Sequence, residues 1–307
     1  MCQRQKATVI LMSHFGNPAG ADPAYSIKQI APFLPWPVTI LPDLARPAND
    51  GQIYLLENLR FFSGEKNKEH HFAQQLARMG DVYINEAFSV CHRDHASITV
   101  LPKLLPAYAG PHLAREIAVM KHIVDMKSHP IIFVVGGAKI STKMPYLAPI
   151  LKHIDYMIVG GAFVSAFSDT NNSETQNLLK EYRRKIILPK DVVRDDNGAI
   201  MDLGSESIQQ NSEIIRHAKL IIWNGVLGKV EKKPYDKATQ ALVDAIQKNP
   251  AAHLVVGGGT TAGVINPNMA QLYHVSTGGG AFLEYYAYHK LVGVKALSRR
   301  KRSTFRV

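Results

Sequence analysis

The chain has 307 residues, of which 46% are hydrophobic and 20% charged, and its formal net charge is +11. This composition excludes an intrinsically disordered protein, and no apolar run is long enough to span a bilayer or to serve as a signal peptide. The two cysteines, Cys2 and Cys91, exclude a disulfide scaffold and favour a reducing compartment, so we expect a cytoplasmic protein without a membrane partner.

Six of the positive charges, and no acid, lie in the last thirteen residues. A solvated terminal tail explains such a run, and binding to nucleic acid or an anionic surface is the alternative. We expect no nucleic-acid partner, because the aromatic residues are not interleaved with basic ones as in a single-strand binding platform. The mild positive excess of the rest of the chain suits an acidic small-molecule substrate. The basic residues of the tail are Lys295, Arg299, Arg300, Lys301, Arg302 and Arg306.

Strands and helices are predicted to alternate in the first third of the chain. In the second helix, Phe72, Leu76 and Met79 recur at i, i+4 and i+7 and therefore share one face, whereas the Glu69–His71 start of this helix is expected in solvent. The expected strands cover residues 7–13, 38–43, 53–58 and 81–88, and the expected helices cover residues 25–34 and 68–79.

The loops after these strands carry histidine and arginine. Residues 91–95, CHRDH, look like a metal cluster but lack a second ligand pair with zinc spacing, so we expect no metal site. His92 and Arg93 suit an anion clamp better, because arginine presents a planar fork to phosphate or carboxylate. His14 and Arg60 follow the first and third predicted strands.

Residues 111–130 form a long helical run between two prolines. We interpret it as a helix between two domains, because it separates the arginine- and histidine-rich part from a glycine-rich part. The alternative is a crossover helix within one continuous sheet.

Five apolar runs between residues 131 and 280 stop on glycine. Such runs predict buried parallel strands, and glycine at their carboxyl ends permits positive φ and the close approach of a ligand. Several turns of this kind on one sheet edge would collect backbone N–H groups and helix N-termini, which bind phosphate. We therefore expect a nucleotide-binding edge. The five runs are IIFVVGGAK, YMIVGGAF, LIIWNGVLG, LVVGGGTT and YHVSTGGG.

Residues 136–143, GGAKISTK, are expected to open a helix. Lys139 and Lys143 would then be neighbours on one helical face, where two ammonium groups suit a polyphosphate; two solvated lysines are the alternative. The segment is not a Walker A loop, because the GxxxxGK spacing is absent. Glu231 is a candidate to hydrogen-bond a ribose hydroxyl; the alternative is a surface acid without a ligand.

In this order, the motifs VILMSHFGNP, LLENLRFFSGE, HRDHAS, VVGGAKISTK, IIWNGVLGKVE, VVGGGTTAG and HVSTGGGAFLE resemble those of phosphoglycerate kinases along nearly the whole chain. The resemblance implies an α/β protein with two doubly wound, parallel-sheet (Rossmann-like) domains joined by a hinge helix. It implies reversible phosphoryl transfer between 1,3-bisphosphoglycerate and ADP in glycolysis, with Mg²⁺ carried on ATP or ADP. It also implies a monomer in which hinge closure brings together two half-sites.

Domain boundaries follow from the same resemblance. Residues 1–112 would form the phosphoglycerate-binding domain without its first strand, residues 113–289 the hinge helix and nucleotide-binding domain, and residues 290–307 a C-terminal segment with the basic tail.

The resemblance also implies a role for each motif residue. Lys139, Arg60 and Arg93 would be catalytic, and His14, Arg60, His92 and Arg93 would bind the phosphoglycerate. The nucleotide would contact Gly137, Lys139, Lys143, Gly160, Gly161, Asn224, Glu231, Gly257, Gly258, Gly259, Thr260, Thr261, Gly278, Gly279 and Gly280.

Several positions depart from the family pattern. Asn17 stands where an arginine is expected, Thr260 stands where an aspartate helps to hold the magnesium-nucleotide, and several connecting loops are short. The family strand and substrate loop expected before Ala7 are missing, and MCQRQK stands in place of a preceding helix. These departures leave two alternatives open: a catalytically decayed homologue that acts as a nucleotide-binding or interaction protein, and a misassigned start codon.

Overall fold

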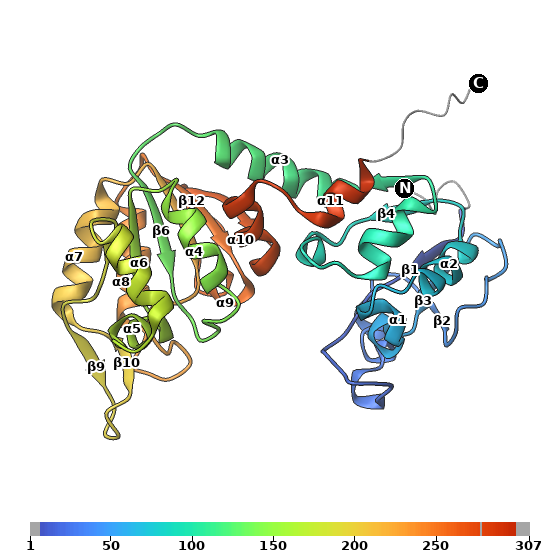
Figure 1. The fold of residues 1–307 in the computed structure, drawn as a ribbon, viewed down its shortest axis with the longest axis horizontal. Helices are drawn as coiled ribbons and strands as arrows, with labels where there is room; N and C mark the ends of the chain where they lie inside the picture. Colours follow the sequence, from blue (N-terminus) through green and yellow to red (C-terminus); the bar gives the residue numbers. More distant parts are fainter. Residues whose placement is uncertain (1–6, 277, 299–307) are drawn as a thin grey trace. The chain divides into compact units, whose positions relative to one another are not determined.

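The computed structural model describes residues 7–276 and 278–298, which form two compact units. The first consists of the described residues within Met1–Ala114 and Leu291–Val307, and the second of those within Arg115–Lys290. Helix α3 (Pro111–Asp125) begins in the first unit and continues into the second (Figure 1). Its first turn starts on a proline, and the Leu113 amide donates to the Glu86 Oε2 atom at 3.0 Å.

The first unit contains two small parallel sheets. One has the strand order β1-β3-β2, and the other pairs β4 with β5. The four strands predicted in this part are confirmed, whereas β5 was not predicted. The strands are β1 (Val9–Leu11), β2 (Thr39–Leu41), β3 (Ile53–Leu56), β4 (Tyr83–Asn85) and β5 (Ala107–Ala109).

Helix α2 (His70–Met79) carries the core of the first unit. Phe72, Leu76 and Met79 are all buried, which confirms the predicted apolar face. The helix expected over residues 25–34 is wrong: residues 23–33 form three 3-10 turns, and Pro23 and Pro32 within them cannot donate to an α-helical ladder. The unit also contains the α-helices α1 (Ser63–Lys66) and α11 (Val292–Leu297) and a π-helix over Ala96–Val100. Its 3-10 turns cover Pro23–Tyr25, Ile27–Gln29, Ala31–Phe33, Leu59–Phe61, Phe88–Val90 and Leu101–Lys103.

Helix α11 brings the end of the described chain back to the first unit. The Gly293 amide donates to the Cys91 carbonyl at 2.8 Å, and a Cβ at Gly293 would lie 2.7 Å from the Ile98 side chain. The basic residues after Ser298 lie outside the described residues.

The second unit is built on a six-stranded parallel sheet with the order β13-β12-β11-β6-β7-β8. Every residue of β6 and β11 is buried, which explains why both strands are apolar throughout. A separate antiparallel pair joins β9 to β10. The strands are β6 (Ile131–Val135), β7 (Tyr156–Val159), β8 (Ile186–Ile187), β9 (Val192–Arg194), β10 (Ile200–Leu203), β11 (Leu220–Asn224), β12 (His253–Gly257) and β13 (Leu272–Ser276).

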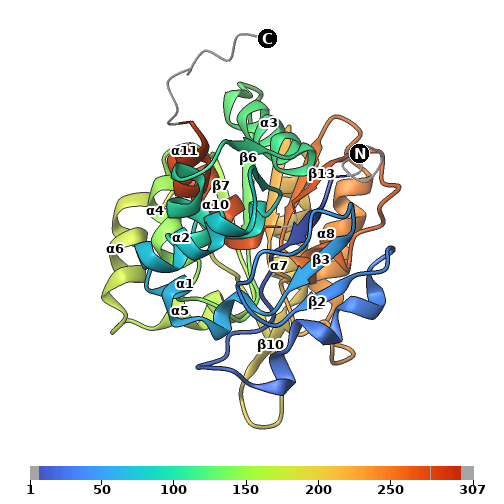
Figure 2. The same ribbon diagram turned by 90° about the vertical axis from the view of Figure 1, so that its right-hand side faces the viewer.

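Helices cover both faces of this sheet, as expected for a doubly wound fold. Helix α4 packs against α10 and α7 packs against α8, and the two pairs lie on opposite faces (Figure 2). No helix in residues 7–276 or 278–298 is long and apolar enough to cross a bilayer. The helices are α4 (Met144–Leu151), α5 (Ala162–Ser168), α6 (Ser173–Tyr182), α7 (Ser205–Arg216), α8 (Lys237–Gln247), α9 (Gly259–Ala262) and α10 (Gly279–Tyr288).

Candidate active site

In the first unit, Asn58 positions the turn that follows β3. Its Nδ2 atom donates to the carbonyls of Phe15 and Tyr25, both at 2.8 Å, and its Oδ1 atom accepts from the Arg60 amide at 3.0 Å. One buried amide therefore joins the loop after β1 to the turn that carries Arg60. Long-range contacts of this kind hold the Arg60 backbone in a defined place.

The Arg60 side chain is 7% exposed, yet much of its hydrogen-bonding capacity is unused. Its Nη1 atom donates to the Gly16 carbonyl, whereas Nε and Nη2 are buried without a protein partner. Burial, followed by the charge of Arg93, lowers the pKa of Arg60. A guanidinium that is desolvated, repelled and only partly bonded is suited to an anionic ligand that would satisfy its free donors.

Arg60 belongs to a cluster that also contains His14, His92 and Arg93. Burial first, and then the charges of Arg60 and Arg93, lower the pKa of His14 to about 4. Burial, and then Arg93, likewise lower the pKa of His92 to about 4, and its Nδ1 atom is buried without a partner. The structure thus brings together the four residues predicted for the phosphoglycerate.

Two further residues of this cluster were missed in the sequence. His95 contributes to lowering the pKa of both His14 and His92, and its Nδ1 atom lies 3.6 Å from the Glu65 Oε1 atom. Glu65 is buried and accepts from the amide and hydroxyl of Ser97 at 2.9 and 2.6 Å. The HRDH spacing contained the signal for His95, because it places two histidines three residues apart.

The carboxyl ends of the second unit's parallel strands form the predicted glycine edge. The chain runs from β6 to β7 on one side and returns through β11 to β12 on the other, so β6 and β11 flank a topological switch point. Here Gly225 has φ 101° and Gly161 has φ 56°, and a Cβ on either would collide with the backbone of the neighbouring glycine turn. The Gly161 amide donates to the Leu227 carbonyl at 2.7 Å, which locks two of these turns together.

The two lysines of GGAKISTK differ from the expectation. Residues 136–143 are not helical, with a turn only at 141–143, and α4 begins at Met144, so Lys139 and Lys143 do not share a helical face, and that prediction is wrong. Lys139 is exposed in the loop. Lys143 instead donates from Nζ to the carbonyls of Gly136 and Asn224 at 2.6 and 3.0 Å, and burial lowers its pKa to about 8.

Polar side chains line the turns of β11 and β12. Asn224 is 3% exposed and its Nδ2 atom has no partner, while the Thr261 hydroxyl accepts from the Gly225 amide at 2.8 Å. A Cβ at Gly257 would lie 2.9 Å from that Asn224 Nδ2 atom. Asn224 therefore keeps a free donor beside the β12 glycines, whereas Thr261 holds the two turns in register.

The remaining nucleotide candidates lie at or near this edge. Gly257 ends β12, Gly258 and Gly278 cap α9 and α10, and a Cβ at Gly279 would lie 3.6 Å from the Gly258 Cα atom. Thr260 and Glu231 are exposed. Across residues 7–276 and 278–298, no group of three or more His, Cys, Asp or Glu side chains could hold a metal ion. Gly137 and Gly160 lie in the glycine turns, and Gly259 and Gly280 lie in the first turns of α9 and α10.

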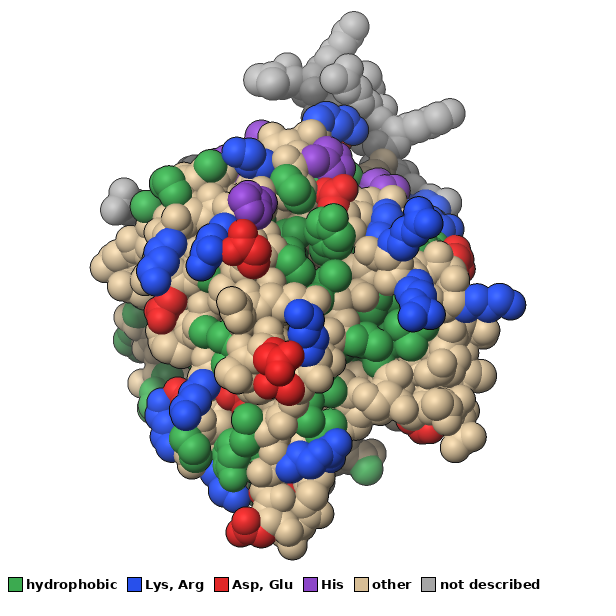
Figure 3. Space-filling view, turned by 90° about the vertical axis from the view of Figure 1, so that its left-hand side faces the viewer, with side chains coloured by type: hydrophobic (Ala, Val, Ile, Leu, Met, Phe, Trp, Pro, Cys, Tyr) green, Lys and Arg blue, Asp and Glu red, His purple; other side chains and the backbone are tan. Residues whose placement is uncertain are grey.

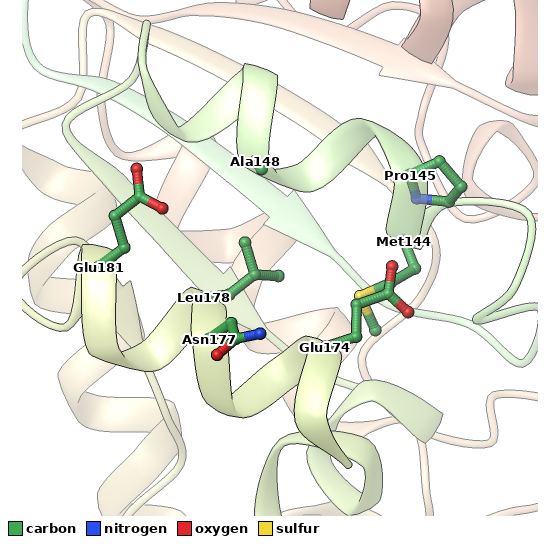
Figure 4. A pocket seen from close by; sticks show the side chains of 7 residues that line it. All are labelled: Met144, Pro145, Ala148, Glu174, Asn177, Leu178 and Glu181. Atoms are coloured by element: carbon green, nitrogen blue, oxygen red, sulfur yellow. The ribbon is translucent and has the colours of Figure 1, made fainter.

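A cavity of about 240 Å³ between α4 and α6 contains none of the predicted site residues (Figure 4). Met144, Ala148 and Leu178 give it apolar walls, and Glu174 and Glu181 add carboxylates. Negative charge does not suit a phosphate. On the face in Figure 3, lysine and arginine side chains are scattered among acidic ones, so the residues described there form no continuous basic stripe.

Comparison with known proteins decides the family. The family model for phosphoglycerate kinase matches residues 1–287. The phosphoglycerate kinase of Zymomonas mobilis is 34% identical over 95% of this chain and 86% of its own length, and that of Methylorubrum extorquens is 35% identical over 94% and 85%. The phosphoglycerate kinase structure from Pyrococcus horikoshii has a TM-score of 0.83 at 25% identity, covering 97% of this chain and 88% of its own. The chain belongs to the phosphoglycerate kinase family.

Family membership establishes the reaction. The protein is an enzyme, a phosphotransferase that moves a phosphoryl group reversibly between 1,3-bisphosphoglycerate and ADP in glycolysis. The alternative of a decayed homologue receives no support from these comparisons. The alignment with the Zymomonas mobilis phosphoglycerate kinase spans 343 positions, more than the 307 residues of this chain, so it contains gaps opposite this chain.

The two histidines of the basic cluster predict an acid-sensitive fold. Each folded-state pKa lies near 4, below the ordinary 6.5, so the unfolded chain binds more protons between these values. Stability will therefore fall as the pH drops from about 6.5 to about 4. Urea unfolding of the His14→Asn/His92→Asn variant will show a smaller loss over this window, whereas the exposed control His71→Asn will match the wild type. An equal loss in all three proteins would contradict the assignment.

Proposed function

We propose that the basic cluster of the first unit binds the phosphoglycerate and that the glycine edge of the second unit binds ATP or ADP. The observation that carries this proposal is the buried guanidinium of Arg60, because its Nε and Nη2 donors have no partner in the protein. A carboxylate or phosphate bearing two oxygens would accept from both. Arg93 adds positive charge beside it, and His14 adds an imidazole ring, which suits a substrate with two anionic ends.

At the glycine edge, the proposed roles rest on free donors. The Asn224 Nδ2 atom would donate to a nucleotide phosphate, and backbone amides near Gly258 and Gly279 would surround the phosphate chain. Lys139 is exposed beside this edge and would neutralise the charge that develops on the transferring phosphoryl group. Transfer in line between two oxygens needs positioning and positive charge rather than a covalent intermediate.

Mg²⁺ would enter as part of the nucleotide substrate. The chain does not fit a metal site made by the protein itself, because Thr260 is a neutral hydroxyl and no three His, Cys, Asp or Glu side chains of the described residues are grouped so that they could hold a metal ion. The ion would therefore be held chiefly by nucleotide phosphates. We further propose that the protein acts as a monomer in the cytoplasm.

A coupled assay with ATP and 3-phosphoglycerate on the 307-residue protein tests the proposal. Turnover is expected in the wild type and should fall sharply in Lys139→Ala. Equal turnover in the two proteins would overturn the assignment of Lys139. Binding of 3-phosphoglycerate that survives Arg60→Ala unchanged would overturn the substrate site independently.

Thr260→Asp is expected to strengthen magnesium-dependent binding of ADP. Thr260 lies exposed in the first turn of α9, where a carboxylate would be favoured by the helix N-terminus and could reach the metal. One added ligand of this kind should improve affinity by about tenfold, equivalent to ~1.4 kcal/mol. Calorimetry with and without Mg²⁺ measures it, and Thr260→Asn serves as the neutral control of the same shape. An unchanged dependence on Mg²⁺ would show that position 260 does not face the metal.

A further inference from the structure

A second cavity of the nucleotide-binding unit lies at the end of the sheet opposite the glycine turns. Its volume is about 310 Å³, and it forms where β6 begins and where α4 and α10 end. None of the residues proposed for either substrate lines it. Because the glycine turns follow the carboxyl ends of the strands and this cavity borders the amino end of β6, it is separate from the nucleotide edge.

The polar lining of this cavity is almost entirely cationic or titratable to a cation. Asp155 is the single acid in the lining, and its Oδ2 atom is already contacted by the His129 Nδ1 atom at 2.7 Å and by the Ile131 amide at 2.6 Å. The Asp155 carboxylate is therefore already engaged by these two neighbours. The basic lining residues are Lys127, His129, Lys152, His153, Lys185 and His289.

Lys185 is fixed in the wall. Its Nζ atom donates to the carbonyls of Leu151 and Ile154, both at 2.8 Å, at the end of α4. An ammonium group carries three donors, so one remains for a ligand. Lys127 and Lys152 are exposed, and neither forms an ion pair within the described part of the chain.

Two histidines lie beside these lysines in the lining. The rings of His153 and His289 lie 5.5 Å apart between centroids, and His289 ends α10 in the left-handed conformation with φ 57°. Burial first, and then the charges of His289, Lys152 and Lys185, lower the pKa of His153. The lowered pKa of His153 reflects in part the positive charge that surrounds it, which a bound anion would offset.

Helix ends alone explain only part of this arrangement. The carboxyl ends of helices attract cations, and α3, α4 and α10 all end near the cavity. Lys185 serves that purpose, because it donates to the carbonyls at the end of α4. Lys127 and Lys152 instead border open space, next to the apolar side chains of Ile123, Met126 and Ile154. We propose that this cavity binds a small phosphate-bearing anion, whose carbon skeleton, where it has one, contacts the apolar wall.

Site-resolved NMR of the full chain tests the proposal, with inorganic pyrophosphate and glycerol 3-phosphate as separate probes. Saturable shifts are expected at the amides of Ile131, Asp155 and His289. The Lys127→Ala/Lys152→Ala variant should weaken binding by about tenfold or more. The control Lys180→Ala/Lys248→Ala removes the same charge from exposed positions elsewhere on this unit and should leave the affinity unchanged.

Each result bears on the proposal. Saturable binding of either probe at these amides, weakened only in the first double variant, supports it, and the relative affinity of the two probes reports the contribution of the apolar wall. Shifts confined to the glycine edge or to the Arg60 region would overturn it. So would equal weakening in both double variants, or no saturation at millimolar probe.

Discussion

Arg60→Ala is expected to lower kcat/KM by about 10²–10⁴-fold, because it removes two donors that the protein itself leaves free. Each charge-assisted hydrogen bond to the substrate contributes ~1.5–3 kcal/mol. Since both bonds would form with the same anion, their loss should raise KM for 3-phosphoglycerate and lower kcat together. Steady-state kinetics with each substrate varied in turn measures the effect, and KM for ATP should change little.

The same position predicts an unusual result for stability. In the free enzyme, Arg60 is desolvated, repelled by Arg93 and bonded only to the Gly16 carbonyl. Arg60→Met should therefore leave the melting temperature unchanged or raise it while activity is lost. The exposed Arg46, which pairs with Asp81, is a matched control: Arg46→Met should change neither activity nor stability by much. A marked fall in the melting temperature of Arg60→Met would contradict a ligand-directed guanidinium.

Much of the fold could be predicted because apolar runs report burial directly. The continuous apolar strands β6 and β11 lie in the centre of a parallel sheet, and Phe72 and Leu76 face the core as their spacing indicates. Strand β5 escaped prediction, because its sequence, Ala-Tyr-Ala, is short and largely exposed. Its pairing with β4 depends on tertiary contacts rather than on local preference.

The predicted helix at Lys139 failed for a reason that the sequence contained. Pro145 has no amide proton and is favoured in the first turn of a helix, where it lies in α4, although the same helix also accommodates Pro149 further along. The burial of Arg60 is a different case. It depends on Asn58 reaching the carbonyls of Phe15 and Tyr25, which lie far away in the sequence, and no local pattern reports such contacts.

Lys139 and Lys143 should separate into two phenotypes, although the sequence assigns both to the nucleotide. Lys139 is exposed, so Lys139→Ala should leave the free energy of unfolding unchanged and lower kcat by about 10²–10³-fold, the usual effect of losing one group that stabilises transition-state charge. Lys143 is bonded to the Gly136 and Asn224 carbonyls between β6 and β11. Lys143→Met removes both bonds and should destabilise the second unit by ~1–3 kcal/mol.

Comparing the two variants distinguishes a lysine that stabilises phosphate charge from a lysine that holds the glycine turns together. Urea unfolding gives the stability, and ADP calorimetry gives the affinity of each protein. If Lys143 acts mainly by holding the two glycine turns together, Lys143→Met will weaken ADP binding along with stability, whereas Lys139→Ala will keep both and lose only turnover. A Lys143→Met protein of wild-type stability with weakened ADP binding would instead mean that Nζ leaves the two carbonyls and contacts the phosphates directly. That outcome is chemically accessible, because the phosphate charge would restore the pKa that burial lowers to about 8.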